Sequence, residues 1–181
     1  MARFACLLFL TNFALAAPIP KGAGTVTIYY PTTAGAKWVY VTPDGDEQTI
    51  EVADVKRDGG DVVVSLKGDD APPDKIIVSA DGLRYVRDGT DGKLGGVMMK
   101  AKFREGDSWK LSDGSERTIS GPEVVEVPAG KFTAVKVTVT VREFDQIIWY
   151  APGVGEVKRT VKKNGVEAVM RSLKSFADGK K

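Results

Sequence analysis

The chain has 181 residues, with 26 Lys and Arg against 24 Asp and Glu and a formal net charge of +2. It contains no histidine and one cysteine, Cys6, so the usual zinc, copper and haem ligands and the Ser-His-Asp and Cys-His catalytic arrangements are missing. The near-neutral balance of charge argues against nucleic acid as a partner.

Residues 1–16 are predicted to be a signal peptide. Arg3 supplies the positive start, the stretch after it is mostly apolar, and Ala14-Leu15-Ala16 is a small-x-small cleavage site. The apolar stretch is too short to span a bilayer, and Cys6 lies inside it. We expect an exported protein, periplasmic or extracellular, with no transmembrane segment after signal cleavage.

Residues 17–36 are rich in Gly, Pro, Ala and Thr and are predicted to be a flexible N-terminal tether. A single β domain is predicted over residues 37–176, followed by a disordered tail at 177–181. Without disulfides, a domain of this length must be held together by burial and hydrogen bonding.

The predicted domain contains an internal repeat. The matching pairs are Trp38 with Trp109, Asp44-Gly45 with Asp113-Gly114, Ile76-Ile77 with Ile147-Ile148, Gly82 with Gly153, and Val86 with Val157. The offset is 71 residues at Trp and 69 at Asp-Gly, and it returns to 71 from Ile147 onward. A steady offset indicates one β-rich unit used twice. We expect residues 38–87 and 109–158 to superpose, with Trp38 and Trp109 in equivalent buried positions.

Strands and turns alternate along both units. In the first unit, strands are predicted over 38–41, 48–55, 61–67, 76–80 and 83–87. Gly89 to Gly96 is a flexible connector, and Val97 to Phe103 leads from it into the second unit. In the second unit, strands are predicted over 108–111, over 116–127 as two pieces divided by Gly121-Pro122, and over 131–142, 147–151 and 156–162.

The last element, residues 166–176, follows the hairpin signal Asn164-Gly165. Its apolar spacing also fits a helix; the turn favours a strand, and a strand is our prediction. The fold class is therefore all-β: an antiparallel curved sheet forming a barrel or half-barrel, with a two-sheet β-sandwich as the alternative.

No catalytic, metal or cofactor site stands out. The Asp-rich turns, such as Asp44-Gly45-Asp46, lack the spacing of a calcium loop and are interpreted as solvated hairpin turns. No acidic pair is singled out by its spacing as catalytic. We therefore expect no cofactor, no metal and no enzymatic activity.

Features found in only one unit are the better candidates for function. Trp149 and Tyr150 have Val78 and Ser79 as repeat partners, and adjacent strand residues face opposite ways, so one is expected inside and the other exposed. From Glu156 to the C-terminus there are eight basic and three acidic residues; a solvated sheet face is the alternative reading of that segment. The candidate binding surface consists of Trp149, Tyr150, Lys158, Arg159 and Lys162.

The second unit resembles a family of exported bacterial β-rich proteins of unknown function called TapB-like. The motifs are Gly106/Trp109, Val127-Pro128-Ala129-Gly130-Lys131-Phe132, and the run from Trp149 to Lys158 (WYAPGVGEVK). The resemblance covers roughly residues 28–176. It implies an all-β fold outside the cytoplasm, and the family has no established catalytic residues to carry over.

Three functions are consistent with these features. The first is a non-enzymatic domain of the cell envelope that binds or scaffolds. The second is a carrier of lipid or another hydrophobic ligand in a groove of the curved sheet, and the third is a hydrolase that uses carboxylates alone. Candidate partners are envelope lipid, polysaccharide or another envelope protein.

Overall fold

The computed structural model describes residues 28–68, 74–87, 96–111 and 113–179. Within these ranges the chain is all-β, with twelve strands and no helix. The strands are β1 (Lys37–Val41), β2 (Glu47–Asp58), β3 (Asp61–Gly68), β4 (Asp74–Ser79), β5 (Gly82–Arg87), β6 (Val97–Lys100), β7 (Ser108–Lys110), β8 (Glu116–Val127), β9 (Gly130–Val141), β10 (Phe144–Ala151), β11 (Gly155–Lys163) and β12 (Val166–Ala177).

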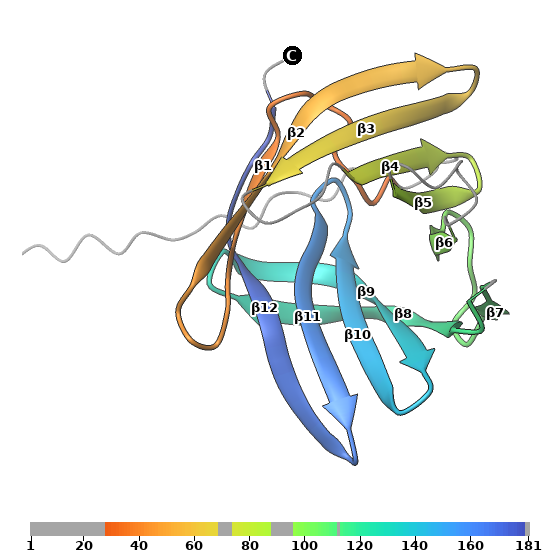
Figure 1. The fold of residues 1–181 in the computed structure, drawn as a ribbon, viewed down its shortest axis with the longest axis vertical. Helices are drawn as coiled ribbons and strands as arrows, with labels where there is room; N and C mark the ends of the chain where they lie inside the picture. Colours follow the sequence, from red (N-terminus) through yellow and green to blue (C-terminus); the bar gives the residue numbers. More distant parts are fainter. Residues whose placement is uncertain (1–27, 69–73, 88–95, 112, 180–181) are drawn as a thin grey trace, which may run out of the picture.

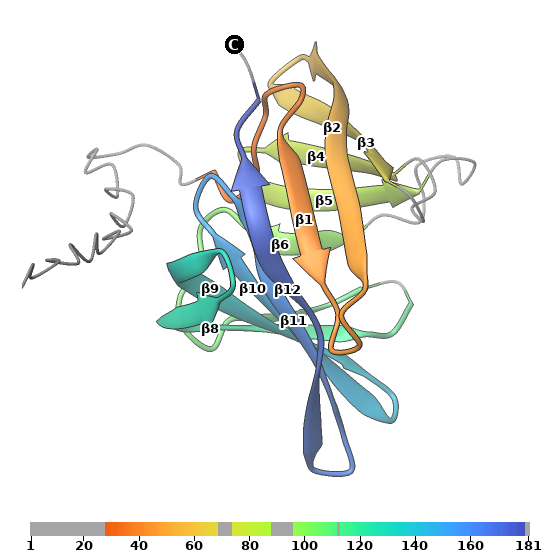
Figure 2. The same ribbon diagram turned by 90° about the vertical axis from the view of Figure 1, so that its left-hand side faces the viewer.

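All twelve strands of the described ranges belong to one antiparallel sheet in the order β6-β5-β4-β3-β2-β1-β12-β11-β10-β9-β8-β7. Each half, β1–β6 and β7–β12, runs back and forth in chain order, and pairing of β1 with β12 joins the halves. The sheet curves back on itself, so that β1–β5 lie across from β8–β12 (Figures 1 and 2). The predicted curved antiparallel sheet is confirmed, and the sandwich alternative is wrong.

The sheet does not close into a barrel, because its free edges β6 and β7 do not pair with each other. The two edges nevertheless lie near one another (Figure 1). The indole Nε1 of Trp109 in β7 donates a hydrogen bond of 2.9 Å to the carbonyl oxygen of Val97 in β6. The ammonium of Lys100 lies 5.0 Å from the centre of the same indole ring. Side-chain contacts therefore hold the edges together where backbone pairing is missing.

The hydrophobic alternation of β9 is the sequence pattern that the structure follows most directly. Val135, Val137 and Val139 are buried, whereas Lys136 and Thr138 between them are only partly buried. This period of two is expected for a sheet with one face packed and the other wet. The predicted division of residues 116–127 takes the form of a register shift between Ser120 and Pro122 inside one strand.

The last element is a strand, as the turn chemistry predicted. Asn164 and Gly165 both have positive φ angles, 52° and 80°, which is the geometry of a two-residue hairpin turn of the primed kind. β12 then pairs with β11 on one side and with β1 on the other. The pairing of β12 with β1 is therefore the seam that joins the two halves of the sheet.

The two repeated tryptophans differ in burial. Trp38 is 1% exposed in the core, and its Nε1 donates to the carbonyl of Val154 at 2.6 Å. Trp109 is only partly buried, so the expected equivalence in burial is wrong. The reason is topological: β1 lies in the middle of the sheet, whereas β7 is its edge. The internal repeat and the superposition of the two units stay predictions.

The predicted tether lies partly outside the described residues. Its described part, residues 28–36, is packed rather than loose, because Tyr29 and Tyr30 contact the core and Ala36 is fully buried. The amide of Val52 also donates to the carbonyl of Ala36. The tether prediction is therefore wrong for this part. The predicted signal peptide and most of the connector before Gly96 lie outside the described residues.

Candidate functional site

The concave face of the sheet encloses a cavity of about 560 Å³. This volume falls in the range of roughly 300–1,000 Å³ that is usual for small-molecule sites. Its lining comprises Tyr30, Trp38, Tyr40, Ile50, Leu66, Ile76, Tyr85, Gly96, Met98, Leu111, Asp113, Arg117, Val139, Gln146, Ile148, Tyr150, Glu156, Arg159 and Arg171. Side chains of the core thus fill the space between the halves of the sheet only in part.

The chemistry of the lining is divided between the two halves. Among the described residues, those that line the cavity from strands β1–β6 and from the segments beside them are all apolar, aromatic or glycine. All the charged lining residues come from the second half: Asp113, Arg117, Glu156, Arg159 and Arg171. A ligand in this cavity would therefore meet an apolar wall on one side and a charged wall on the other.

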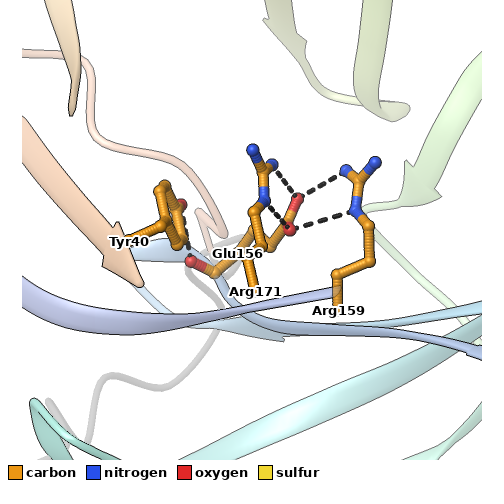
Figure 3. Close-up of polar contacts among 4 residues, drawn as sticks. All are labelled: Tyr40, Glu156, Arg159 and Arg171. Atoms are coloured by element: carbon orange, nitrogen blue, oxygen red, sulfur yellow. Dashed lines mark hydrogen bonds and ion pairs between the residues drawn. The ribbon is translucent and has the colours of Figure 1, made fainter. Parts of the chain in front are cut away.

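A buried carboxylate held by two arginines forms the centre of the charged wall (Figure 3). Arg159 donates from Nε and Nη2 to the two oxygens of Glu156 at 3.0 and 2.6 Å. Arg171 donates in the same two-pronged way at 2.7 and 2.9 Å. Such charge-assisted fork contacts are the strongest hydrogen bonds available to side chains. Because one carboxylate serves two guanidinium groups, the Arg-Glu-Arg cluster has a net charge of +1.

The cluster also explains the protonation state of Glu156. Burial by itself favours the neutral acid, but the charges of Arg159 and Arg171 and their hydrogen bonds outweigh it and hold the pKa of the Glu156 carboxyl at about 2. Conversely, burial disfavours the charged arginines, but the Glu156 carboxylate outweighs it and raises the pKa of both guanidinium groups. All three groups are therefore ionised at neutral pH.

Two tyrosines complete the surroundings of the cluster. The hydroxyl of Tyr40 donates to the backbone carbonyl of Glu156 at 2.9 Å, and the guanidinium of Arg171 lies 4.5 Å from the centre of the Tyr40 ring. Burial and then the negative charge of Glu156 raise the pKa of Tyr40 well above its ordinary value and that of Tyr150 to about 12. Both phenols therefore stay neutral and can donate hydrogen bonds.

Arg117, on β8, is the third arginine of the wall and differs from the other two. Its Nη1 is buried and has no hydrogen-bond partner among the described residues. Burial lowers the pKa of its guanidinium, and the nearby charge of Arg159 lowers it further. Asp113 is near enough to attract it electrostatically but is exposed and hydrogen-bonds to Ser115 instead.

Two β-bulges bring Glu156, Arg159 and Arg171 onto the face of the sheet that lines the cavity. Arg159 lies directly opposite Arg171, whereas Thr160 lies opposite Val169, so Met170 is an extra residue in β12. If the register continued from Thr160 and Val169 without this bulge, Arg159 would lie opposite Met170. Arg171 would then point to the other face of the sheet. A second shift places Tyr150 opposite Glu156 while Trp149 is opposite Lys158.

The residues of the predicted binding surface do not form one surface. Tyr150 and Arg159 line the cavity. Trp149 and Lys158 are paired on the opposite face, where Lys158 lies 5.3 Å from the centre of the indole ring. Lys162 is exposed toward the end of the β11–β12 hairpin. Alternation along the strands separates these groups, because neighbouring residues project from opposite faces.

The expectation that Trp149 or Tyr150 is exposed is wrong. Trp149 is 7% exposed and Tyr150 is 2% exposed. Trp149 donates from Nε1 to Oε1 of Glu123 at 2.5 Å, and Lys136 and Lys158 lie directly opposite it on the two neighbouring strands. Long side chains on the convex face thus cover the indole, since lysine stems readily pack on apolar surface.

Sequence reasoning missed Glu156, Arg171 and Arg117 as members of the site. The sequence contains one usable signal, which is an isolated acid at the start of an otherwise basic strand. The spacing of Glu156 and Arg159 by three residues is wrong for sharing the face of a regular strand, and only the bulge at Val157 resolves it. Arg117 stands in a strand without any distinguishing pattern.

The described residues hold no group of three or more Cys, Asp or Glu side chains placed to bind a metal. In the same part of the chain, no helix has the length and apolar character needed to cross a membrane. The Asp-rich turns of the first unit that are described, at Asp44 and Asp46, are exposed.

Comparison with known proteins supports the fold. No family model matches the sequence, and no curated protein matches it. Two solved structures share the fold, each at 16% sequence identity over 84% of this chain and 100% of the other. One is a protein of Bacteroides fragilis, provisionally assigned as exported and with a YmcC-like fold, at a TM-score of 0.51. The other is a protein of Parabacteroides distasonis, provisionally assigned as a lipoprotein, at a TM-score of 0.50. This chain is therefore similar in fold to envelope-assigned proteins whose descriptions name no activity.

Proposed function

We propose that this protein is an exported binding domain that holds a small hydrophobic or amphipathic ligand in the cavity of its curved sheet. The observation that carries the proposal is the cavity of about 560 Å³ with its aromatic and aliphatic wall. A protein that only scaffolds gains nothing from leaving this space unfilled, because apolar side chains packed together there would stabilise the fold. Location outside the cytoplasm is supported by the signal-like residues 1–16 and by the assignments of the two fold neighbours.

The alternative of a carboxylate-dependent hydrolase is less well supported. Among the described residues the most buried acid is Glu156, which two arginines hold ionised, with a pKa of about 2. Such a group cannot donate a proton near neutral pH, and its oxygens are already engaged by Arg159 and Arg171. The TapB-like resemblance fits the proposal but adds no ligand to it.

Titration with N-phenyl-1-naphthylamine, an uncharged apolar fluorophore, tests the proposal directly. We expect saturable fluorescence enhancement with the wild-type protein. Leu66→Trp and Met98→Trp, at two places on the apolar wall, should each reduce the amplitude or weaken binding several-fold, because the larger ring occupies the cavity. Val124→Trp is the matched control, since Val124 is 71% exposed and does not line the cavity.

Native mass spectrometry of protein purified from its host gives an independent readout. A bound species of lipid-like mass that disappears in the two cavity variants would support the proposal. Wild-type protein that carries no ligand and gives no saturable probe signal would overturn it.

A further inference from the structure

The charged wall of the cavity has an unbalanced positive charge, which the proposed function alone does not explain. Among the described residues, the charged side chains that line the cavity are three arginines, Glu156 and the exposed Asp113, so the charged wall has a net charge of +1. Buried charges without partners are costly, and proteins that keep them normally pair them. An anionic ligand would balance this charge.

The arginines also have hydrogen-bond donors to spare. Each guanidinium has five N–H groups, and Glu156 engages only Nε and Nη2 of Arg159 and of Arg171. Figure 3 shows the remaining terminal nitrogen of each group turned away from the carboxylate. Arg117 adds a buried Nη1 with no partner among the described residues. Planar forks of this kind match carboxylate and phosphate oxygens.

The apolar wall, opposite the arginines, determines which chemistry suits the rest of the ligand. Ile50 and Leu66 on β2 and β3, Ile76 on β4 and Met98 on β6 line the cavity across from the arginines. These side chains offer contact area without hydrogen bonds, which suits an aliphatic chain. A free inorganic anion would leave this wall unused, and a wholly apolar ligand would leave the arginines unpaired.

We propose that the cavity binds a single-chain lipid whose carboxylate or phosphate head pairs with Arg117, Arg159 and Arg171 while its chain lies along the apolar wall of β2–β6. This inference rests on the proposed function and names its ligand class. Glu156 is a positioning residue, because it fixes the direction of both arginine forks and lowers their net charge to match one anionic head.

The test compares ligands with the same chain and different heads. Binding of hexadecanoate, hexadecan-1-ol and hexadecyltrimethylammonium is measured by displacement of the bound fluorophore, below the aggregation concentration of each. We expect the wild-type protein to bind hexadecanoate roughly tenfold or more tightly than the alcohol, since charge-assisted hydrogen bonds are about twice as strong as neutral ones. The cationic ligand should bind most weakly.

The variant Arg117→Met tests whether Arg117 is responsible for the preference for hexadecanoate over the alcohol. It should weaken hexadecanoate binding by roughly tenfold and leave the alcohol unchanged, because it removes a charged donor but keeps an apolar stem of similar length. Arg57→Met is the matched control, since Arg57 is exposed on β2 and lies outside the cavity. Arg117→Lys serves as a second variant: it should retain part of the preference through its charge, even if the methionine variant folds poorly.

The outcomes separate the two proposals. Equal affinity for the acid and the alcohol, or an unchanged preference in Arg117→Met, would overturn the anionic-head inference and leave the proposed function standing. Binding of none of the three ligands would overturn both. Displacement by inorganic phosphate alone, as effective as by hexadecanoate, would identify a free-anion site and overturn the lipid assignment.

Discussion

The two halves of the sheet build the two walls of one cavity from opposite chemistry. Each half contains six strands that run back and forth in chain order, yet the charged lining residues all come from β7–β12 and the loop before β8. Under the predicted 71-residue offset, Glu156 corresponds to Tyr85, and both line the cavity. The comparison teaches that two halves with the same back-and-forth strand order can present opposite chemistry to one cavity.

The walls also differ in how their energy is distributed. The apolar wall is stabilised by many small contacts, so the loss of one is graded. In the charged wall, the negative charge of Glu156 balances the positive charges of the arginines beside it. Removing one of these residues therefore leaves a buried charge without its partner. The following predictions use this difference, from the largest expected effect to the smallest.

Glu156→Gln should be the most damaging single change in the charged wall. It leaves Arg159 and Arg171 facing each other without a counter-charge, and we expect the free energy of unfolding to fall by about 3–5 kcal/mol. Glu51→Gln on β2 is the matched control in the other half, because Glu51 pairs with the exposed Lys67; its cost should stay below about 1 kcal/mol. Chemical denaturation measures both, and similar losses in the two variants would contradict the division between the walls.

As the pH falls, we expect the charged wall to lose its stabilising interactions at a higher pH than the apolar wall does. The pKa of Glu156 in the folded protein, about 2, lies below its ordinary value of 4.5, so the unfolded chain binds the proton more readily. The stability from this group is complete above about pH 4.5 and is lost as the pH falls through 2, by about 3 kcal/mol in total. Denaturant midpoints between pH 6 and 2 should fall more steeply in the wild type than in Glu156→Gln. Parallel pH profiles would assign the acid sensitivity elsewhere.

Substitution of Trp38 on β1 and of Trp109 on β7 compares the seam between β1 and β12 with the contact between the free edges of the sheet. Trp38→Phe should cost about 2 kcal/mol, because it removes the donor to Val154 at a buried site. Trp109→Phe should cost about 1 kcal/mol, because its indole is only partly buried and the carbonyl of Val97 at the sheet edge can turn to water. Thermal unfolding of the two variants measures the order. A larger effect at Trp109 would mean that contact between the free edges, rather than the β1–β12 seam, controls stability.

Local sequence signals determined most of the fold. Period-two alternation in β9 predicted its buried face, and Asn164-Gly165 predicted the last hairpin. These signals are short-range, because side-chain alternation and turn geometry depend on adjacent residues. They also indicated, through Tyr150 and Arg159, that the second unit carries the distinctive residues.

Only the tertiary structure decided which residues share the cavity. The extra residues Val157 and Met170 shift the register of β11 and β12, and no local pattern marks a bulge in advance. A one-residue shift turns the following side chains to the other face, so the same sequence could have placed Arg171 away from Glu156. The placement of Trp109 at a free edge and of Trp38 at the seam likewise follows from the pairing of β1 with β12, residues more than a hundred positions apart in the chain. Pairing at that distance is set by the packing of the whole sheet, which local propensity does not encode.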